Sequence, residues 1–147
     1  MPRFARLFEA AADTLNAYYQ AVADNSIDAV MSLWIDEEFA TCICADGTHL
    51  HGLESIRAGL GKQFGAQAVS IEPLDIRVYD SLGTVVYAIA EAHQPAGTAA
   101  PRMIFSTYVM VHERGEWRIA HIHASEMPME AAGQFAAKLR HGQGPLH

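Results

Sequence analysis

A carboxylate and an imidazole lie two residues apart near the end of a run of alternating apolar residues. Glu91 and His93 share one face of the strand expected over 84–93, because successive strand side chains point to opposite sides. A carboxylate in an apolar cavity is a candidate general base, and a neighbouring imidazole can polarise or orient its substrate. The alternative is a solvated strand end just before the loop expected over 94–101.

A second histidine pair, His121 and His123, also shares one strand face. Two imidazoles placed in this way could ligate one metal ion. The competing interpretation is a buried structural role or a place in a subunit interface, because Tyr108 and Ser125 could satisfy the ring nitrogens. We favour the structural role, and we expect neither a metal site nor a cofactor.

A hairpin combines two cysteines with two histidines. The dipeptide Asp46-Gly47 is typical of a two-residue turn, here between strands expected at 39–45 and 48–51. This register places four metal-binding side chains on one face, in the pattern of a zinc site: Cys42, Cys44, His49 and His51. Cross-strand Cβ atoms are roughly 5 Å apart, so tetrahedral closure would require bending. Buried apolar cysteines are the alternative, and a disulfide between residues two apart on a strand is disfavoured.

Length and charge limit the functions that this chain can have. The 147 residues suggest one domain, half of the residues are hydrophobic, and the formal net charge of −7 argues against general binding to nucleic acids or anionic membranes. No apolar run approaches the 18 residues of a membrane span. Two cysteines and the absence of a signal-like N-terminus predict a cytoplasmic protein.

Four helices are expected from the hydrophobic periodicity. The first carries an apolar stripe at helical spacing, made of Phe4, Phe8, Ala11, Leu15, Tyr18 and Val22. A short second helix has an apolar face between Ile27 and Trp34. The third is expected over about 53–64, and a last short helix over 129–140 precedes a tail from about 141.

Four longer strands are expected at 69–79, 84–93, 102–112 and 116–126. Pro73 should lie on an edge strand or at a bulge, because proline has no N–H to donate to a neighbouring strand. Helices in the N-terminal half followed by a strand meander predict an α+β domain over 1–147, with the sheet folded around its helices.

The two faces of the last two long strands differ in polarity. A turn at Arg114-Gly115 would pair Met110 with Ile119 and Tyr108 with His121. We assign to the core the more apolar face, which carries Met103, Phe105, Thr107, Val109, Val111, Ala120, Ile122 and Ala124. The opposite face, with Ile104, Ser106, Tyr108, Met110 and His112, is too aromatic for free solvation and predicts a homodimer or a higher homo-oligomer.

Two segments resemble a known superfamily. The stretch DGTHLHGLESIRAGL and the ending ERGEWRIAHIHAS at 113–125 are similar to nuclear transport factor 2-like proteins. The SnoaL-like branch and the association domain of calcium/calmodulin-dependent protein kinase II are the most similar. The resemblance implies a conical, cystatin-like α+β barrel whose curved sheet wraps the first helix and leaves a pocket at its open end. Members include isomerases, dehydratases, cyclases, ligand-binding proteins and oligomerisation modules, so the fold alone does not give the chemistry.

The resemblance also implies which residues line the pocket. Positions that are arginines in the kinase association domain fall near Ile89, Val109 and Ala124, so this pocket should be more apolar. Glu54 and Ile56 fall at pocket positions on the third helix. The other expected lining residues are Trp34, Phe64, Tyr87, Phe105 and Ile122.

Two functions follow as expectations. The first is a SnoaL-like protein that binds an apolar or mixed small molecule, whose chemistry could be that of an isomerase, cyclase or dehydratase. Comparison with the ketosteroid isomerase branch makes Glu91 the candidate base, with His93 or Tyr18 as its polar partner. The second is a non-catalytic association module like the kinase domain.

Overall fold

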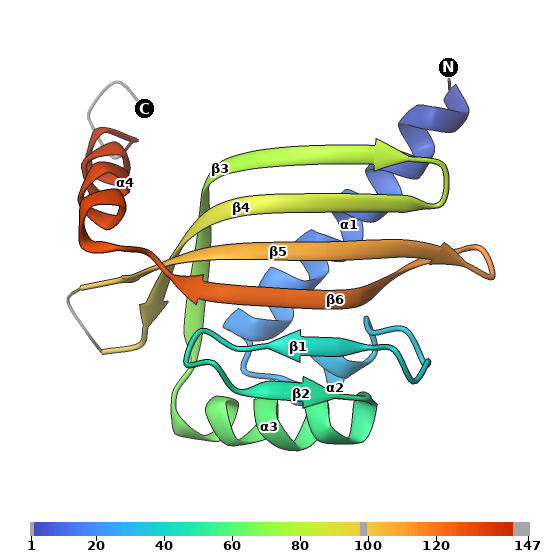
Figure 1. Ribbon diagram of the computed structural model, residues 1–147, viewed down its shortest axis with the longest axis horizontal. Coiled ribbons are helices and arrows are strands. Elements are labelled where there is room, and N and C mark those ends of the chain that lie inside the picture. Colours follow the sequence, from blue (N-terminus) through green and yellow to red (C-terminus); the bar gives the residue numbers. More distant parts are fainter. Residues whose placement is uncertain (1, 98–99, 143–147) are drawn as a thin grey trace.

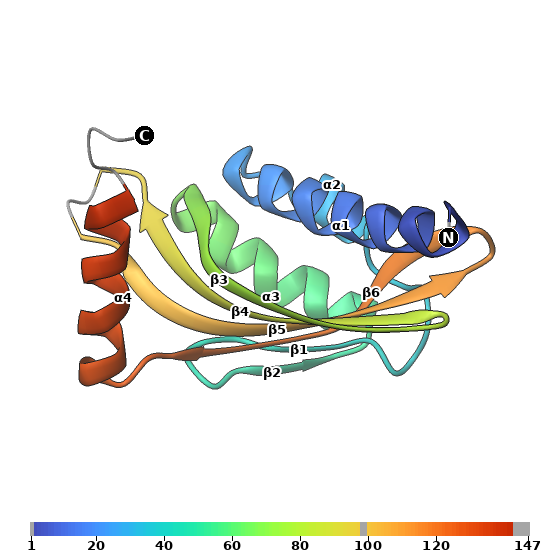
Figure 2. The same ribbon diagram turned by 90° about the horizontal axis from the view of Figure 1, so that it is seen from above.

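The computed structural model describes residues 2–97 and 100–142. The elements in this part of the chain are α1 (Pro2–Ala23), α2 (Ile27–Met31), β1 (Thr41–Ile43), β2 (His49–His51), α3 (Leu53–Ala66), β3 (Val69–Ser81), β4 (Thr84–Pro95), β5 (Arg102–Glu113), β6 (Glu116–Glu126) and α4 (Met129–Gly142). Helices α1, α2 and α3 lie on the concave side of one curved sheet, and α4 crosses one end of it (Figures 1 and 2). The expected α+β fold is therefore confirmed. The expected tail begins within α4, and residues 143–147 lie outside the described residues.

The sheet is open and mainly antiparallel. Its strand order is β2-β1-β6-β5-β4-β3, with β1 parallel to β6 and every other neighbouring pair antiparallel. Strand β3 is an edge strand, and its register against β4 shifts between Pro73 and Asp75. Both alternatives expected for Pro73 are therefore present. At an edge position or at a bulge no neighbouring strand needs a hydrogen bond from this residue, so a proline without an N–H is tolerated.

Amphipathic sequence explains the helices. In α1 the buried residues recur at helical spacing, with Ala11, Leu15, Tyr18 and Val22 facing the sheet. Helix α2 begins after Ser26, whose hydroxyl accepts a hydrogen bond from the Ala29 N–H at 3.2 Å. Among the described residues, no helix is both long and apolar enough to cross a membrane.

Helix α3 lies unusually close to β2. A Cβ atom on Gly59 would stand 2.5 Å from Leu50 Cδ1, so a glycine is what allows this approach. The close packing fixes the position of the last two turns of α3, which carry Leu60, Gln63 and Phe64. These side chains form one wall of the cavity described below.

The face assignment for β5 was wrong. Ile104, Ser106, Tyr108 and Met110 are buried against the helices, and Phe105 on the other face is 38% exposed. The expected pair of Met110 with Ile119 is confirmed, but Tyr108 pairs with Ile122.

A register shift between β5 and β6 is the cause of that error. Val109 pairs with His121 and Met110 pairs with Ile119, which leaves Ala120 as an extra residue in β6. One extra residue reverses the alternation beyond it. Ile119 and Ile122 are therefore both buried, and the strict alternation assumed from the sequence assigns β5 to the wrong side.

The expected two-residue turn at Asp46-Gly47 was also wrong. The Cys44 N–H donates to the Thr48 carbonyl at 2.9 Å, so three residues, 45–47, make the connection. Cys42 pairs with Leu50, and both cysteines are buried. The histidines at 49 and 51 are exposed on the other face, so the four side chains do not converge. Among the described residues, no group of three or more metal-binding side chains could hold an ion.

Candidate functional site

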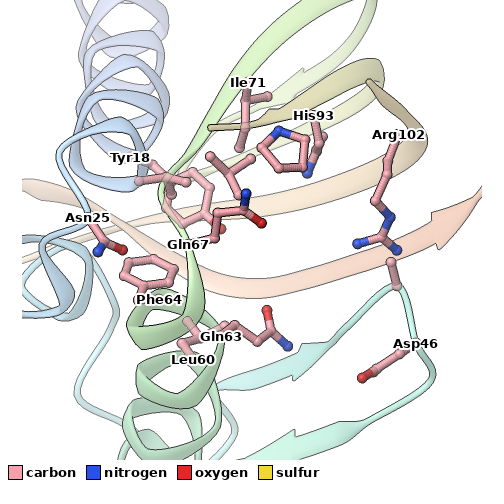
Figure 3. A pocket seen from close by; sticks show the side chains of 14 residues that line it. Tyr18, Asn25, Asp46, Leu60, Gln63, Phe64, Gln67, Ile71, His93 and Arg102 are labelled. Atoms are coloured by element: carbon pink, nitrogen blue, oxygen red, sulfur yellow. The ribbon is translucent and has the colours of Figure 1, made fainter. Parts of the chain in front are cut away.

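A cavity of about 420 Å³ lies on the concave side of the sheet, between α1, α3 and one end of β3 and β4. Figure 3 shows side chains from these elements and from the β1–β2 loop around it. Apolar lining residues are Tyr18, Val22, Ala45, Leu60, Phe64, Val69, Ile71 and Pro95. Polar lining residues are Asn25, Asp46, Gln63, Gln67, His93 and Arg102. The wall suits a molecule with an apolar body and a few polar groups.

Glu91 is fully buried behind this cavity and is completely hydrogen-bonded. Its Oε2 accepts from the hydroxyls of Tyr19 at 2.7 Å and Tyr108 at 2.6 Å. Its Oε1 accepts from the hydroxyl of Ser106 at 2.8 Å and pairs with His93 Nε2 at 2.7 Å. An ionised carboxylate only accepts and has about four lone-pair sites. The four neighbours therefore match an ionised Glu91.

Three elements bring these groups together. Strand alternation places Glu91 and His93 on the inner face of β4, and it places Ser106 and Tyr108 on the inner face of β5. Helix α1 supplies Tyr19 from above the sheet. The aromatic rings pack edge to face, with centroids 5.6 Å apart for Tyr18 and Tyr108 and 6.2 Å apart for Tyr19 and Tyr108. This packing holds the phenols in one orientation.

The three tyrosines of this cluster remain protonated. Burial raises the pKa of Tyr18, Tyr19 and Tyr108, because a phenolate would lose its hydration. The charge of Glu91 raises the pKa of each phenol further. Each hydroxyl is therefore a donor throughout the neutral pH range.

His93 is the member of the cluster that reaches the cavity. Its side chain is 22% exposed and lines the cavity wall, whereas Glu91 is 0% exposed. Because a carboxylate oxygen accepts, Nε2 is the donor of this hydrogen bond. In the neutral imidazole the lone pair is then on the second ring nitrogen, Nδ1. Glu91 thus sets the tautomer and the orientation of His93.

The mouth of the cavity is polar. Arg102 forms an ion pair with Glu126. Hydrogen bonds from Thr48, whose N–H donates to Asp46 Oδ1 at 2.9 Å, lower the pKa of the Asp46 carboxyl. The Gln67 amide donates to the Ala96 carbonyl. Figure 3 shows Arg102 and Asp46 on the same side of the opening.

Three residues expected at the site from the sequence line this cavity: Tyr18, Phe64 and His93. Glu91 lies directly behind it and contacts His93. The expected pairing of a carboxylate with an imidazole is present as a hydrogen bond, and Tyr18 packs on Tyr108 rather than on Glu91 itself.

The other expected lining residues lie elsewhere. Side chains packed in the core are Ile56, Tyr87, Ile89 and Ile122. Trp34 is buried beside a separate cavity of about 380 Å³, and Glu54 is exposed on α3. Ala124 is half-buried next to Ser106. Phe105 and Val109 point to the outer face because of the register of β5, and Phe105 packs on Phe135 of α4.

Sequence reasoning missed Tyr19 as a donor and did not connect Ser106 and Tyr108 with Glu91. A signal was available, because Ser106 and Tyr108 share one face of a strand and a buried carboxylate needs donors. Tyr19 flanks the apolar stripe of α1, and only its length lets its hydroxyl reach the carboxylate. The cavity residues of the β1–β2 loop gave no such signal.

Known proteins share this architecture. A family described as the SnoaL-like domain matches residues 11–130. No curated protein matches the chain. A solved structure from Thiobacillus denitrificans, a proposed calcium/calmodulin-dependent protein kinase type II association domain, is 25% identical with a TM-score of 0.70. The match covers 78% of this chain and 93% of that one.

Two more distant structures have similar folds. A proposed dehydratase of the nuclear transport factor 2-like family from Streptomyces avermitilis is 17% identical, with a TM-score of 0.76, covering 82% of this chain and 95% of that one. A proposed ketosteroid isomerase from Shewanella frigidimarina is 16% identical, with a TM-score of 0.67, covering 79% and 94% respectively. At these identities the likeness concerns the fold.

Proposed function

Because this chain belongs to the SnoaL-like domain family, we propose that it binds a small, partly apolar molecule in the cavity and moves a proton on that molecule with His93. The observation that carries the proposal is the Glu91–His93 pair. A fully buried, fully hydrogen-bonded carboxylate orients an imidazole that stands in the wall of a ligand-sized cavity. Fixed orientation of a base is what proton transfer requires.

The geometry favours His93 over Glu91 as the group that contacts the substrate. Glu91 has no exposed surface, and both of its oxygens are occupied. Nδ1 of His93 can accept a proton from a carbon next to a carbonyl, and Glu91 then stabilises the imidazolium. Returning that proton to another carbon gives an isomerisation. Returning it to a departing hydroxyl gives a dehydration.

Tyr18 is the candidate electrophile of this reaction. It lines the cavity, and burial keeps its hydroxyl protonated, so it can donate to a substrate carbonyl. The names of the similar structures, a proposed dehydratase and a proposed ketosteroid isomerase, fit these two outcomes. The substrate class we propose is a cyclic carbonyl compound with an acidic α-hydrogen.

The test is deuterium exchange at carbon, followed by NMR in heavy water. A panel of cyclic ketones, cyclic enones and β-hydroxy ketones is incubated with the protein, and ligand binding is recorded by saturation transfer. We expect at least one bound compound to exchange its α-hydrogen, and His93→Gln to slow the exchange by about 100-fold. Glu91→Gln should slow it too, because the amide no longer orients the imidazole in the same way.

The matched control is His123→Gln, which removes an exposed histidine from the outer face. It should leave exchange and binding unchanged. Equal exchange rates for the wild type and His93→Gln would rule out the proton-transfer role. Absence of binding by every compound in the panel would count against the proposed substrate class.

Self-association is the second candidate function. The solved structure that is 25% identical is a proposed association domain, and this likeness covers 78% of the present chain. We propose that the chain forms at least a homodimer. The aromatic face of β5 that predicted an interface from the sequence is buried against the helices, so the proposal depends on this likeness alone. Light scattering at micromolar concentration tests this proposal. A monomer mass would exclude the association function and would leave the proposed role of His93 unaffected.

A further inference from the structure

The polar side chains of the cavity wall have donors and acceptors that can be counted one by one. They are Asn25, Asp46, Gln63, Gln67, His93 and Arg102. In Figure 3 the amides of Gln63 and Gln67 point toward the side where Arg102 lies, and Tyr18 and Phe64 lie on the other side. A polar group of the ligand on this side must match the donors or acceptors that the protein has not already used.

The donor side of the Gln67 amide is already engaged. Its Nε2 donates to the backbone carbonyl of Ala96, the residue after β4. The Ala96 N–H donates in turn to the Ala68 carbonyl at 2.9 Å, so the end of α3 is linked to the end of β4. The first bond sets the orientation of the amide, because only its nitrogen can donate. The atom that faces away from Ala96 is therefore Oε1, which can only accept.

Two other polar side chains of the wall also offer acceptors. His93 uses Nε2 for its hydrogen bond to Glu91, so in the neutral ring the lone pair is on Nδ1. Asp46 accepts from the Thr48 N–H through Oδ1, and as a carboxylate it has no proton to donate. The polar side of the cavity is thus matched by a ligand group that donates a hydrogen bond.

The charges at the mouth indicate that this donor is uncharged. Arg102 Nε donates to Glu126 Oε1 at 3.2 Å, and its Nη2 donates to the same oxygen. The carboxylate of Asp46 lies on the same side of the opening as Arg102 (Figure 3). A carboxylate on the ligand would meet two acidic groups here, and an ammonium would meet the guanidinium. A hydroxyl group can donate without either repulsion.

We propose that the cyclic carbonyl substrate carries a hydroxyl group, and that Gln67 selects this group by accepting its hydrogen bond through Oε1. This inference rests on the proposed function and narrows its substrate class. Gln67 follows the end of α3 and His93 comes from β4, so the hydroxyl group and the reacting carbon belong to different parts of one molecule. Gln67 determines specificity and takes no part in the proton transfer.

Binding of matched tetralones tests the proposal. The panel consists of α-tetralone, its hydroxy isomers and the corresponding methoxy isomers, and NMR titration gives the dissociation constant of each. We expect at least one hydroxy isomer to bind about fivefold more tightly than α-tetralone and than its methoxy counterpart, because a methoxy oxygen cannot donate. Equal affinities for every hydroxy and methoxy pair would overturn the proposal.

Variants of the two cavity glutamines assign the preference to one residue. Gln67→Met keeps the length of the side chain and removes its carbonyl oxygen, so the preference for the hydroxy isomer should disappear while α-tetralone binds as it does to the wild type. A merely structural role of Gln67 would weaken both compounds equally. Gln63→Met, four residues earlier, is the matched control and should keep the ratio of the two affinities. A preference that persists in Gln67→Met would overturn the proposal.

The same compounds separate this inference from the proton-transfer role. His93→Gln should keep the preference for the hydroxy isomer and lose the exchange of α-hydrogens. A wild-type protein that prefers the hydroxy isomer but exchanges no α-hydrogen would contradict the role of His93 alone. One that exchanges α-hydrogens equally well in hydroxy and methoxy isomers, with equal affinities, would contradict the role of Gln67 alone.

Discussion

Tyr87 and Tyr108 are paired residues on the adjacent strands β4 and β5, and both side chains are buried. The Tyr108 hydroxyl donates to Glu91 Oε2 at 2.6 Å. The Tyr87 hydroxyl has no hydrogen-bond partner in the part of the chain that the structure describes. Two neighbouring phenols with similar burial therefore differ in whether their polar atom is satisfied.

The same difference divides the concave face of the sheet into two ends. The polar end consists of Glu91 and the side chains that bond to it, namely Tyr19, His93, Ser106 and Tyr108. The aromatic end consists of Trp34, Tyr87 and Trp117. Each aromatic-end side chain buries an N–H or O–H that has no partner among the described residues.

This contrast shows that the two ends are stabilised by different forces. An unpaired buried donor costs about 1–3 kcal/mol, so the aromatic end must owe its stability to the apolar area of its rings. At the polar end each oxygen of Glu91 is satisfied, which specifies one arrangement of side chains. The cavity adjoins the polar end through His93. The side chains with a fixed hydrogen-bond geometry are thus those beside the cavity, where the proposed proton transfer would need an oriented base.

The largest expected effect comes from removing the acceptor of the polar end. Glu91→Leu would leave four hydrogen-bonding groups without their partner, two of which, Ser106 and Tyr108, are buried, and we expect the free energy of unfolding to fall by about 4 kcal/mol in urea titrations. The matched control is Ile104→Val, the residue paired with Glu91 on β5, which should cost about 1 kcal/mol. A loss as small as that of the control would mean that hydrogen bonds do not hold the polar end.

The two tyrosines provide the next test, with one oxygen atom removed from each. Tyr108→Phe should lower the free energy of unfolding by about 1.5 kcal/mol, because Glu91 loses a donor. Tyr87→Phe should leave stability unchanged or raise it by up to about 1 kcal/mol, because its hydroxyl is buried without a partner. Both values come from chemical denaturation. Equal losses in the two variants would contradict the division into two ends.

Much of the fold followed from local sequence signals. The order of helices and strands, the irregularity at Pro73 and the common face of Glu91 and His93 depend on periodicity and on single residue types, and the structure has all of them. These features concern one element at a time. Their physical causes act within a few residues of the chain.

What the sequence could not show depends on how two elements meet. Ala120 is an extra residue in β6 that nothing in its own sequence marks, and it puts Ile122 instead of His121 on the buried face, beside Tyr108 of β5. The third residue of the turn at 45–47 separates Cys42 and Cys44 from the nearby histidines in the same way. A shift of one residue in register changes every side-chain direction beyond it.

A smaller effect is expected when the polar end loses one donor and keeps its carboxylate. Ser106→Ala removes the hydroxyl that lies 2.8 Å from Glu91 Oε1, and we expect a loss of about 1 kcal/mol in thermal or urea unfolding. Thr107→Ala, the neighbouring residue on the outer face, is the control and should stay within about 0.5 kcal/mol of the wild type. If both variants lost the same amount, the position of Ser106 in the cluster would not matter.

The outer face of the sheet offers a third case, because the charged groups that act on His121 are other histidines instead of a carboxylate. Desolvation, and then the charges of His123 and His49, lower its pKa below the ordinary 6.5, although the Thr41 backbone acts the other way. Above pH 6.5 this histidine is neutral in both states and has no effect. As the pH falls below 6.5 the unfolded chain binds a proton more readily, so stability is lost.

His121→Gln should therefore match the wild type at pH 7.5 and lose less stability on acidification to pH 5.5, by a few tenths of a kcal/mol because the ring is partly exposed. Urea titrations at the two pH values measure this difference, with His51→Gln as the same substitution elsewhere on the outer face. If His121→Gln lost as much stability on acidification as the wild type, the acid sensitivity would not come from the outer face. The concave face of the sheet would then be the place to look for it, starting with the polar end, where His93 is hydrogen-bonded to Glu91.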